Sequence, residues 1–562
     1  MLGSDQLDLD SNEMEIHDMP AKPKPRKAKP SVLNELDTLN GKVDFADGGQ
    51  LERLEQLVKQ LRQARISEEE RYSDDVVVVR LSDEVSADSP EVQSASVLGL
   101  GNTSTAFAKG GKRAAPKMDL IHQFRGSMAV KANRSALMAV RSNSPGLKVT
   151  PATWLYPQYI RPMGDELDAF AIQVSEGMRA KRFEVQLTDA EGKPVAKVKV
   201  RALLDWNGAH ASVESDSQGI ALFSIPLSYP KIELLIVEPE HTYWSVFVSG
   251  FERVAAPKRV SIELKALTPY GFGLINHYAP YEENAGENVS VGVIDCGVGP
   301  HDALELAGGA CLVPGENAAD YLDNGLGHGT HVAGTIAAKK LPGTEVYGVA
   351  PACRLFAYRV CPKTGNRGRA RSIEIAAAIE RAIADGCDVV NISMGSLEPM
   401  PEVPGILEQA RNAGMVVFAA TGNDGEPSIR YPARYAHSLA VGALGRDGTF
   451  PLDSPDVNHE SPVRKGNEFV AVFSNYGRET DFIGVGVAVI STYPKGLYAN
   501  MSGTSMATPF TSGMAARLLS KHPEILAMAR GPERADAIIK MLFESTRKVG
   551  WSNDYEGFGV LK

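Results

Sequence analysis

Short apolar runs alternate with longer amphipathic segments along the second half of the chain. Residues 289–294, 355–360, 388–393 and 416–420 are short runs rich in apolar residues, as in strands that are buried on both faces of a sheet. Residues 372–384 instead repeat their apolar positions at helical spacing. Strands and helices that alternate in this way predict an α/β fold with a doubly wound parallel sheet, whose functional site lies at the carboxyl ends of the strands.

Strand patterns also occur earlier in the chain. Residues 76–81, 127–132 and 147–150 predict strands, and Asn133 can cap a helix that follows it. These elements predict a small α+β module over residues 73–165.

The next segment changes to an alternation of polar and apolar residues. Residues 183–187 and 197–201 show this alternation and are separated by turn sequences that contain Asp, Gly and Pro. The pattern predicts an all-β sandwich of immunoglobulin or transthyretin type over residues 180–266. We assign it a spacer or recognition role, because nothing in it suggests chemistry.

The first 72 residues carry weaker patterns. Residues 1–48 are polar, contain prolines among lysines and lack periodicity, which predicts a disordered arm. In residues 49–72 the apolar side chains fall on one helical face. This predicts a helix that either binds a partner protein or packs on its own domain.

Composition bounds the classes of function. The 562 residues carry a formal net charge of -10, which argues against a nucleic-acid binder, and are 43% hydrophobic, enough for sizeable cores. The chain starts with an acidic segment rather than a secretory leader, and we find no apolar run long enough to span a membrane. The five cysteines predict reduced thiols that pack as small hydrophobes in a cytoplasmic protein, with a redox-sensitive Cys296 as the alternative.

Ser505 is the candidate nucleophile. It stands in a turn of small residues that leads into an apolar run with helical spacing. This pattern predicts a helix that begins at or near Ser505, with Pro509 in its first turn and Gly503 leaving room for neighbouring backbone. A hydroxyl at this end of a helix dipole can attack a carbonyl once a base takes its proton and an acid orients the base.

Two segments upstream supply the base and the acid. Residues 325–334 form a glycine-rich entry into a helix and contain both His328 and His331. We assign the base to His328, because His331 lies a turn deeper, where hydrogen bonding within the structure is the expected role. Asp295 follows the buried strand 289–294, so that it points into the crevice at the end of the sheet. The chain order Asp, His, Ser is that of subtilisin and differs from the orders of chymotrypsin and the α/β-hydrolases.

Residues 267–562, which contain these motifs, resemble the subtilisin-type serine endopeptidases, or subtilases. Asn423 stands in a segment similar to the one that supplies the family's oxyanion-hole asparagine. Ser393, Met394 and Gly395 resemble the edge that pairs with an extended peptide. The resemblance implies hydrolysis of peptide bonds in protein or peptide substrates through an acyl-enzyme.

The resemblance also bears on specificity and cofactors. Residues 429–435 resemble the floor of the family's first specificity pocket, and Arg430 falls at the floor position. A guanidinium there would select Asp or Glu before the cleaved bond. The chemistry requires no cofactor, and structural calcium, which is common in the family, maps to no ligand loop of this sequence.

The N-terminal part leaves two interpretations open. The α+β module is similar to a subtilase propeptide, whose last strand leads into the cleft, although an unrelated module fits equally well. Because a sandwich separates it from the protease, self-cleavage can fall near residues 164–166, near Pro269, or not at all. In the first interpretation the chain is a latent intracellular protease, that is, a zymogen that a regulatory partner releases through the N-terminal region. In the second it is a catalytically silent binding protein. The intact catalytic positions favour the protease.

Overall fold

The computed structural model describes most of the chain from Tyr72 onward. The described residues are 72–81, 118–124, 127–132, 147–159, 171, 179–205, 208–239, 241–249, 259–267, 274–365 and 368–562. The predicted N-terminal arm, the helix of residues 49–72 except Tyr72, the helix after Asn133, and the two segments named for self-cleavage lie outside these residues.

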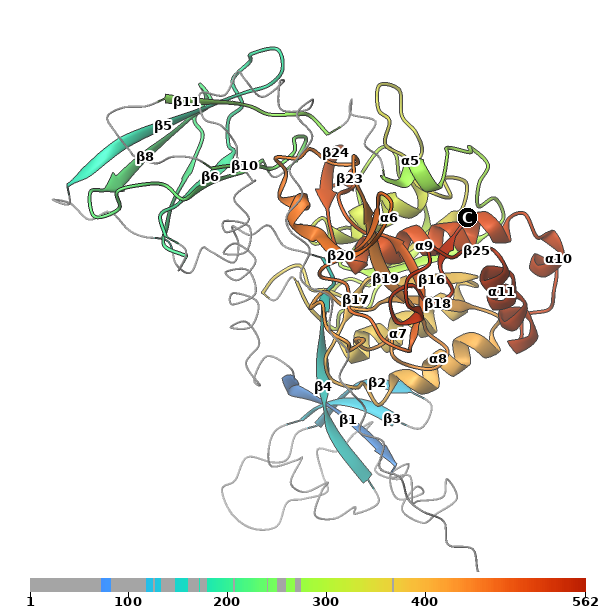
Figure 1. The fold of residues 1–562 in the computed structure, drawn as a ribbon. Helices are drawn as coiled ribbons and strands as arrows, with labels where there is room; N and C mark the ends of the chain where they lie inside the picture. Colours follow the sequence, from blue (N-terminus) through green and yellow to red (C-terminus); the bar gives the residue numbers. More distant parts are fainter. Residues whose placement is uncertain are drawn as a thin grey trace, which may run out of the picture.

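A mostly parallel sheet forms the centre of the second half of the chain (Figure 1). Its strands follow the order β13-β14-β12-β16-β18-β19-β21-β20, and β22 pairs with β19. The pairs from β13 to β19 are parallel, as predicted, whereas β21 is antiparallel to both β19 and β20. The strands are β12 Ser290–Asp295, β13 Leu306–Cys311, β14 Arg354–Arg359, β16 Val389–Ile392, β18 Val416–Ala420, β19 Leu439–Arg446, β20 Glu460–Lys465, β21 Glu468–Ala471 and β22 Thr480–Val485.

Helices cover both faces of this sheet. Val416 and Phe418 of β18 join the core beneath α6 and α9. Val417 and Ala419, which alternate with them, join the core beneath α7 and α8. The predicted α/β fold is therefore confirmed, because each central strand buries both of its faces. The helices are α5 Leu274–Tyr278, α6 His328–Ala337, α7 Ser372–Ala384, α8 Val403–Asn412, α9 Thr504–Leu519, α10 Pro523–Leu526, α11 Pro532–Glu544 and α12 Asn553–Glu556, with a 3₁₀ turn at Pro455–His459.

A small antiparallel sheet packs on the α7 side. Its strands follow the order β4-β1-β3-β2, and its buried side chains, such as Val76 and Phe124, share a core with Ile375 and Ile379 of α7. β4 extends beyond this sheet and pairs with the short strands β15 and β17 (Figure 1). The bounds are β1 Tyr72–Leu81, β2 Met118–Phe124, β3 Ser127–Ala132, β4 Leu147–Pro157, β15 Ala370–Arg371 and β17 Met394–Gly395.

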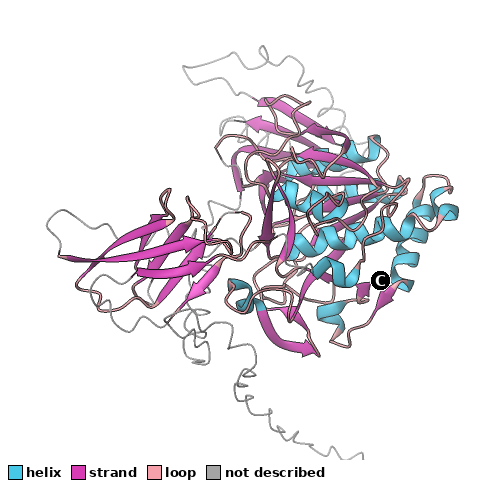
Figure 2. Cartoon of the chain, turned by 90° about the horizontal axis from the view of Figure 1, so that it is seen from above, coloured by secondary structure: helices cyan, strands magenta, loops and turns pink. Residues whose placement is uncertain are grey.

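Two more sheets form a lobe beside the helices and strands of the large domain (Figure 2). They have the orders β10-β9-β6-β7 and β11-β5-β8, and side chains of both, such as Val200 and Phe223, share one core. We call residues 179–267 the β-lobe. Its strands are β5 Ala180–Thr188, β6 Lys199–Leu203, β7 His210–Glu214, β8 Ile220–Pro226, β9 Leu234–Glu238, β10 Val246–Val248 and β11 Arg259–Glu263.

The β-lobe is joined to the large domain by buried and polar contacts. Trp244 is fully buried and belongs to the core beneath α6 and α9 rather than to the core of the lobe. The Thr242 backbone N–H donates to the carbonyl oxygen of Tyr498, in the hairpin of β23 (Val489–Tyr493) and β24 (Leu497–Met501), at 3.1 Å. Lys265 pairs with Asp453 at 3.1 Å. A short antiparallel pair, β25 (Thr546–Arg547) with β26 (Val560–Leu561), closes the chain.

The prediction of five reduced thiols was wrong for one pair. Cys296 and Cys361 form a disulfide, with Cα atoms 4.7 Å apart. They meet because β12 and β14 are neighbours and Asp295 pairs with Arg359, so that the residues just beyond the two strand ends are adjacent. The other three cysteines are free and buried. No helix in the described part of the chain has the length and apolar character needed to cross a membrane.

Candidate active site

Asp295 is the last residue of β12, at the carboxyl end of the parallel sheet. It is fully buried, and its Oδ1 atom accepts hydrogen bonds from His328 Nδ1 at 2.8 Å and from the Cys296 backbone N–H at 2.7 Å. Because a carboxylate only accepts, His328 carries a proton on Nδ1 and leaves Nε2 as the basic atom.

Glycines around His328 allow α6 to approach the end of β12. Gly327, which precedes the helix, has φ 77°, a left-handed conformation that favours glycine. A Cβ atom on Gly329 would lie 2.2 Å from the Gly297 carbonyl oxygen and 3.0 Å from Asp295 Oδ1. A side chain at position 329 would therefore push the histidine away from its carboxylate, and one at position 327 would collide with Tyr493.

His331 has a structural role, as expected. Its Nε2 donates to the carbonyl oxygens of Val489 at 2.9 Å and Ala499 at 3.1 Å. Complete burial lowers the pKa of His331 to about 3. The ring is therefore neutral at ordinary pH and holds the β23–β24 hairpin against α6.

Ser505 is the second residue of α9, which begins at Thr504, where the sequence predicted a helix start. Pro509 lies inside this helix, so the prediction that it occupies the first turn was wrong. In a regular helix the N–H of residue 509 would bond to the Ser505 carbonyl oxygen. Here that oxygen accepts a hydrogen bond from Ser393 Oγ at 2.9 Å, so a side chain replaces the donor that proline lacks.

The Ser505 hydroxyl is not hydrogen-bonded to His328. Ser505 Oγ donates to the Ser393 carbonyl oxygen at 2.8 Å. His328 Nε2 is buried and has no hydrogen-bond partner among the described residues. Catalytic hydrogen bonds of this kind often form only in the reacting complex.

β4 occupies the position predicted for a peptide substrate. It lies between β15 and β17 and is antiparallel to both. Met394 pairs with Pro157, and Gly395 pairs with Tyr156. An extended strand therefore pairs with the edge formed by residues 393–395, and this strand is β4 of the same chain.

This segment crosses the active site at Gln158 and Tyr159. The Gln158 N–H donates to the Ser393 carbonyl oxygen at 3.0 Å, and the Gln158 carbonyl oxygen accepts from the Ser505 backbone N–H at 2.7 Å. The ring centroids of Tyr159 and His328 are 5.0 Å apart. The peptide bond between Gln158 and Tyr159 thus lies beside the serine and the histidine.

Asn423, which follows β18, faces the same carbonyl group. Its Oδ1 accepts from the backbone N–H and the hydroxyl of Thr504, both at 2.9 Å, and its Nδ2 is buried without a hydrogen-bond partner among the described residues. A Cβ atom on Gly503 would lie 2.5 Å from the Gln158 carbonyl oxygen and 3.2 Å from Asn423 Nδ2. Since glycine has no Cβ, the Gln158 carbonyl oxygen can bond to the Ser505 N–H here, with the unpaired Asn423 Nδ2 nearby.

Comparison with known proteins matches residues 286–559 to the model described as the Subtilase family. Subtilisin BL from Lederbergia lenta is 40% identical over 256 residues, which are 45% of this chain and 85% of that protein. M-protease from Shouchella clausii (strain KSM-K16) is 35% identical over 305 residues, 54% of this chain and 70% of that protein. Subtilisin from Bacillus pumilus is 36% identical over 299 residues, 52% of this chain and 96% of that protein.

The chain belongs to the subtilase family. It is a serine endopeptidase of subtilisin type, and its large domain has the α/β subtilisin fold. The matched residues begin after the β-lobe, so that β1 to β11 lie outside the family match.

Arg430, which the sequence predicted at the floor of a specificity pocket, pairs with Asp424. Its Nε and Nη2 atoms donate to Asp424 Oδ2 at 2.9 Å and 2.5 Å, and the residue is 9% exposed. Asn475 Nδ2 donates to the same oxygen at 3.0 Å. The sequence singled out Arg430 but missed Asp424, because nothing in the spacing of the two residues indicated an ion pair.

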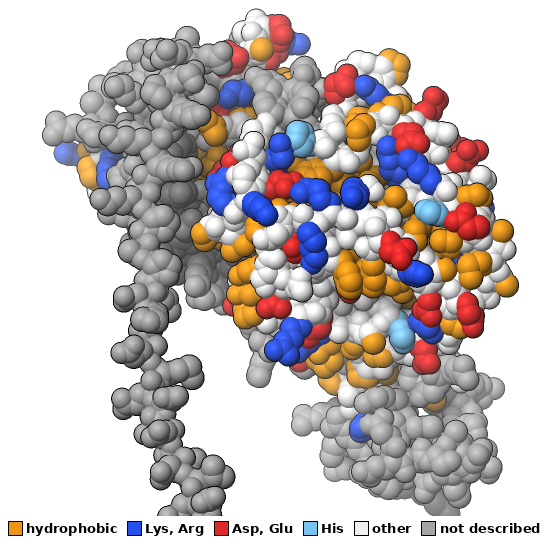
Figure 3. Space-filling model, turned by 45° about the vertical axis from the view of Figure 1, so that its right-hand side comes forward, with side chains coloured by type: hydrophobic (Ala, Val, Ile, Leu, Met, Phe, Trp, Pro, Cys, Tyr) orange, Lys and Arg blue, Asp and Glu red, His pale blue; other side chains and the backbone are white. Residues whose placement is uncertain are grey.

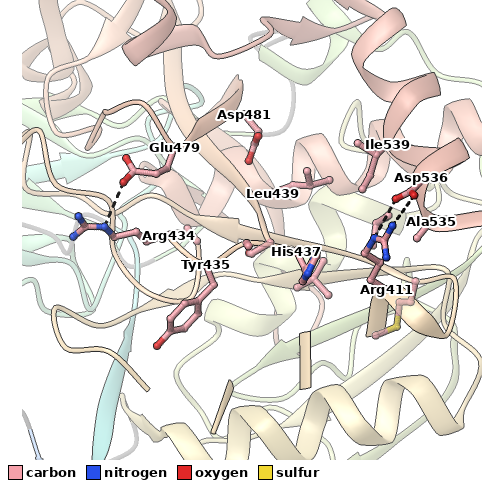
Figure 4. A pocket seen from close by; sticks show the side chains of 16 residues that line it. Arg411, Arg434, Tyr435, His437, Leu439, Glu479, Asp481, Ala535, Asp536 and Ile539 are labelled. Carbon is pink, nitrogen blue, oxygen red and sulfur yellow. Dashed lines mark hydrogen bonds and ion pairs between the residues drawn. The ribbon is translucent and has the colours of Figure 1, made fainter. Parts of the chain in front are cut away.

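A hollow of the large domain lies away from Asp295, His328 and Ser505. It has a volume of about 380 Å³, and Arg434, Glu479 and Asp481 are among the residues that line it (Figure 4). It includes Val416 and Leu439, the first residues of β18 and β19, whereas Asp295 and Asn423 lie at the opposite, carboxyl ends of the strands. This hollow is therefore separate from the peptide-binding edge.

The described residues contain no group of three or more His, Cys, Asp or Glu side chains arranged to hold a metal ion. Subtilases commonly bind structural calcium, but no set of residues here can be assigned to it.

Proposed function

We propose that Ser505 is the nucleophile, His328 the general base, Asp295 the group that orients His328, and Asn423 an oxyanion-hole donor. The observation that carries this proposal is the Gln158 carbonyl oxygen, 2.7 Å from the Ser505 backbone N–H and beside the unpaired Asn423 Nδ2. One donor bonded to the substrate oxygen and a second, unpaired donor nearby can together stabilise the charge that develops in acyl transfer.

The reaction then needs one small rearrangement. Ser505 Oγ leaves the Ser393 carbonyl oxygen and donates to His328 Nε2, which takes the proton as Oγ attacks the substrate carbonyl. The charge on the tetrahedral oxygen is stabilised by Asn423 Nδ2 and the Ser505 N–H. Loss of the Asn423 amide would raise the barrier by about 3 kcal/mol. His328 returns the proton to the leaving amine, and water repeats the sequence to release the acid.

We also propose that the enzyme is made as a zymogen whose residues 73–158 act as a propeptide. Two features support this: β4 fills the groove between β15 and β17, and the bond from Gln158 to Tyr159 lies beside the triad. Cleavage there would separate residues 1–158 from residues 159–562. The β-lobe, which we take to be the predicted sandwich, would remain covalently joined to the protease.

The intact mass of the purified protein, followed over hours, tests both proposals. The wild-type chain should convert to species of residues 1–158 and 159–562, whereas Ser505→Ala should stay full length. A mixture of the two should leave Ser505→Ala uncut at early times if the cut is intramolecular. A new terminus elsewhere would refute the assigned bond. Conversion of Ser505→Ala at the wild-type rate would refute the assignment of Ser505 as the nucleophile.

If neither chain converts, a fluorophosphonate that labels activated serines separates the remaining cases. Labelling that depends on Ser505 and appears only after a second protease has removed the N-terminal region would indicate an active site that this region keeps closed. Absence of labelling after that removal would refute the assigned mechanism and favour the silent peptide-binding protein.

We propose a cytoplasmic enzyme that acts on protein or peptide substrates. It needs no cofactor and binds neither nucleic acid nor membrane. A regulatory partner that acts on the N-terminal region releases its activity. Lys and Arg are interspersed with Asp and Glu on the face seen in Figure 3, which supports only the proposal that the protein does not bind nucleic acid. The acidic preference expected from Arg430 requires a free guanidinium, and its pairing with Asp424 weighs against that preference.

A further inference from the structure

We propose that the pocket for the residue before the cleaved bond selects glutamine, a neutral amide, and discriminates against glutamate. This inference rests on the proposed function, because it takes the chain's own Gln158 as the occupant of that pocket. It names Asp424 as the residue that sets the preference, through its pairing with Arg430.

The position of the Gln158 side chain defines the pocket. A Cβ atom on Gly395 would lie 3.2 Å from Gln158 Cδ and 3.0 Å from Arg430 Cβ. The two side chains therefore lie against the same glycine of β17. Gly422 is also close to Arg430, since a Cβ there would lie 2.5 Å from Arg430 Cγ.

The groups that bind the amide are acceptors. Gln158 Nε2 donates to the carbonyl oxygens of Tyr156 at 2.7 Å and Gly395 at 3.4 Å. An ionised glutamate has no hydrogen to donate, so its carboxylate would face these two oxygens without a hydrogen bond. An unpaired polar group in a partly buried site is costly, which is the basis for discrimination.

Arg430 is the cation that could pair with a glutamate side chain in this pocket, but it already pairs with Asp424. Arg430 directs Nε and Nη2 to Asp424 Oδ2, and Asn475 Nδ2 holds the same oxygen in place. A substrate carboxylate would have to compete with Asp424 for the guanidinium. The pocket thus contains a neutral ion pair rather than a free positive charge.

Four peptides that copy residues 155–158, Leu-Tyr-Pro-X ahead of a fluorogenic amine, test the preference on the processed enzyme. With X as Gln, Glu, Met or Leu, we expect kcat/KM for Gln to exceed that for Glu by at least about tenfold. Met matches Gln in length but cannot donate a hydrogen bond. Equal cutting of Met and Gln would therefore refute the role of the hydrogen bonds donated by the glutamine amide. Equal or faster cutting of Glu would overturn the proposal.

The variant Asp424→Asn tests the residue that sets the preference. It removes the carboxylate that occupies Arg430, so the Glu to Gln ratio of kcat/KM should rise by about tenfold. Glu426→Gln removes the exposed carboxylate two residues away and should leave the ratio unchanged. An unchanged ratio in a folded Asp424→Asn enzyme would overturn the role of Asp424, because a merely structural residue would lower both values together.

Self-cleavage of the full chain gives an independent measurement. Gln158→Glu should slow conversion by at least about tenfold, and Gln158→Met should slow it less. An enzyme that takes the fluorophosphonate label yet cuts none of the four peptides would refute this inference alone. Absence of both labelling and hydrolysis would refute the proposed function itself, and this inference with it.

Discussion

At the scale of single residues, Gly503 determines how closely a peptide carbonyl can approach the nucleophile. The sequence showed this glycine and predicted close backbone approach, and the structure identifies the partner as Gln158, whose carbonyl oxygen is 2.5 Å from where a Cβ would stand. The roles of Asp295, His328 and Ser505 could be assigned from motifs, because each role needs a specific functional group. The pairing of Arg430 with Asp424 could not, because it depends on how one loop folds back on itself.

Gly503→Ala should lower kcat/KM by about 100-fold or more, because the methyl group would fill the oxyanion position, where loss of stabilisation costs about 3 kcal/mol. The control is Gly496→Ala, in the β23–β24 turn, which has φ +76° but nothing within 4 Å of the added Cβ. Both variants should lose about 1 kcal/mol of stability from backbone strain. Equal losses of activity in thermally matched assays would contradict the steric explanation.

At the scale of elements, periodicity predicted those strands and helices whose pattern is local. The bounds of α7, Ser372–Ala384, agree with the prediction because its apolar face repeats at helical spacing. β4 was predicted only for residues 147–150, yet it extends to Pro157. Its second half is extended because β15 and β17, more than 200 residues away in sequence, pair with it, and no local pattern carries that information.

β22 provides a prediction of pH dependence. Burial raises the pKa of Asp481 from 3.8 to about 6, although its hydrogen bond from the Ala440 N–H acts in the opposite direction. The folded protein therefore holds this proton more tightly than the unfolded chain. The associated stability is fully present below about pH 4 and is lost as the pH rises through about 6.

Asp481→Asn should abolish this loss. Its free energy of unfolding relative to wild type should rise by about 1 to 3 kcal/mol between pH 4 and pH 7, measured by denaturant titration at each pH. Glu408→Gln, which removes an exposed carboxylate on α8, should show no such trend. A difference that stays flat with pH would mean that the pKa of Asp481 is the same in the folded and unfolded chain.

The ends of β12 and β14 provide a chemical test. Protein purified without reductant and then denatured should expose three reactive thiols, those of Cys311, Cys353 and Cys387, because Cys296 and Cys361 are joined. After reduction, all five should react. Five thiols without reductant would contradict the disulfide and restore the prediction made from composition.

At the scale of the whole molecule, the β-lobe and the large domain are joined through a shared core. The sequence indicated the strands of the lobe but not its docking, because the contacts come from single residues such as Trp244 and Lys265 that follow no repeating pattern. The β23–β24 hairpin, which the β-lobe contacts through Thr242, also reaches the active site. Tyr493, at the end of β23, donates from its hydroxyl to the carbonyl oxygen of Leu326, two residues before His328.

Trp244→Ala should therefore destabilise the large domain by about 3 to 5 kcal/mol, although the residue lies in the lobe. Loss of hydrolytic activity on heating should move to lower temperature together with unfolding of the lobe. Phe223→Ala, in the lobe's own core, is the matched control and should unfold the lobe with a smaller effect on the temperature at which activity is lost. If Phe223→Ala lowered the temperature at which activity is lost more than Trp244→Ala does, the shared core at Trp244 would not join the two units.

β4 also has a consequence for the timing of activity. Cutting the bond after Gln158 breaks one covalent link, but the pairing of β4 with β15 and β17, and the packing of β1 to β3 on α7, are unaffected by it. The severed fragment is then a product that blocks the groove it was cut in. Activity toward other substrates would appear after a lag, and the length of that lag would be set by the dissociation or digestion of the fragment rather than by the cut.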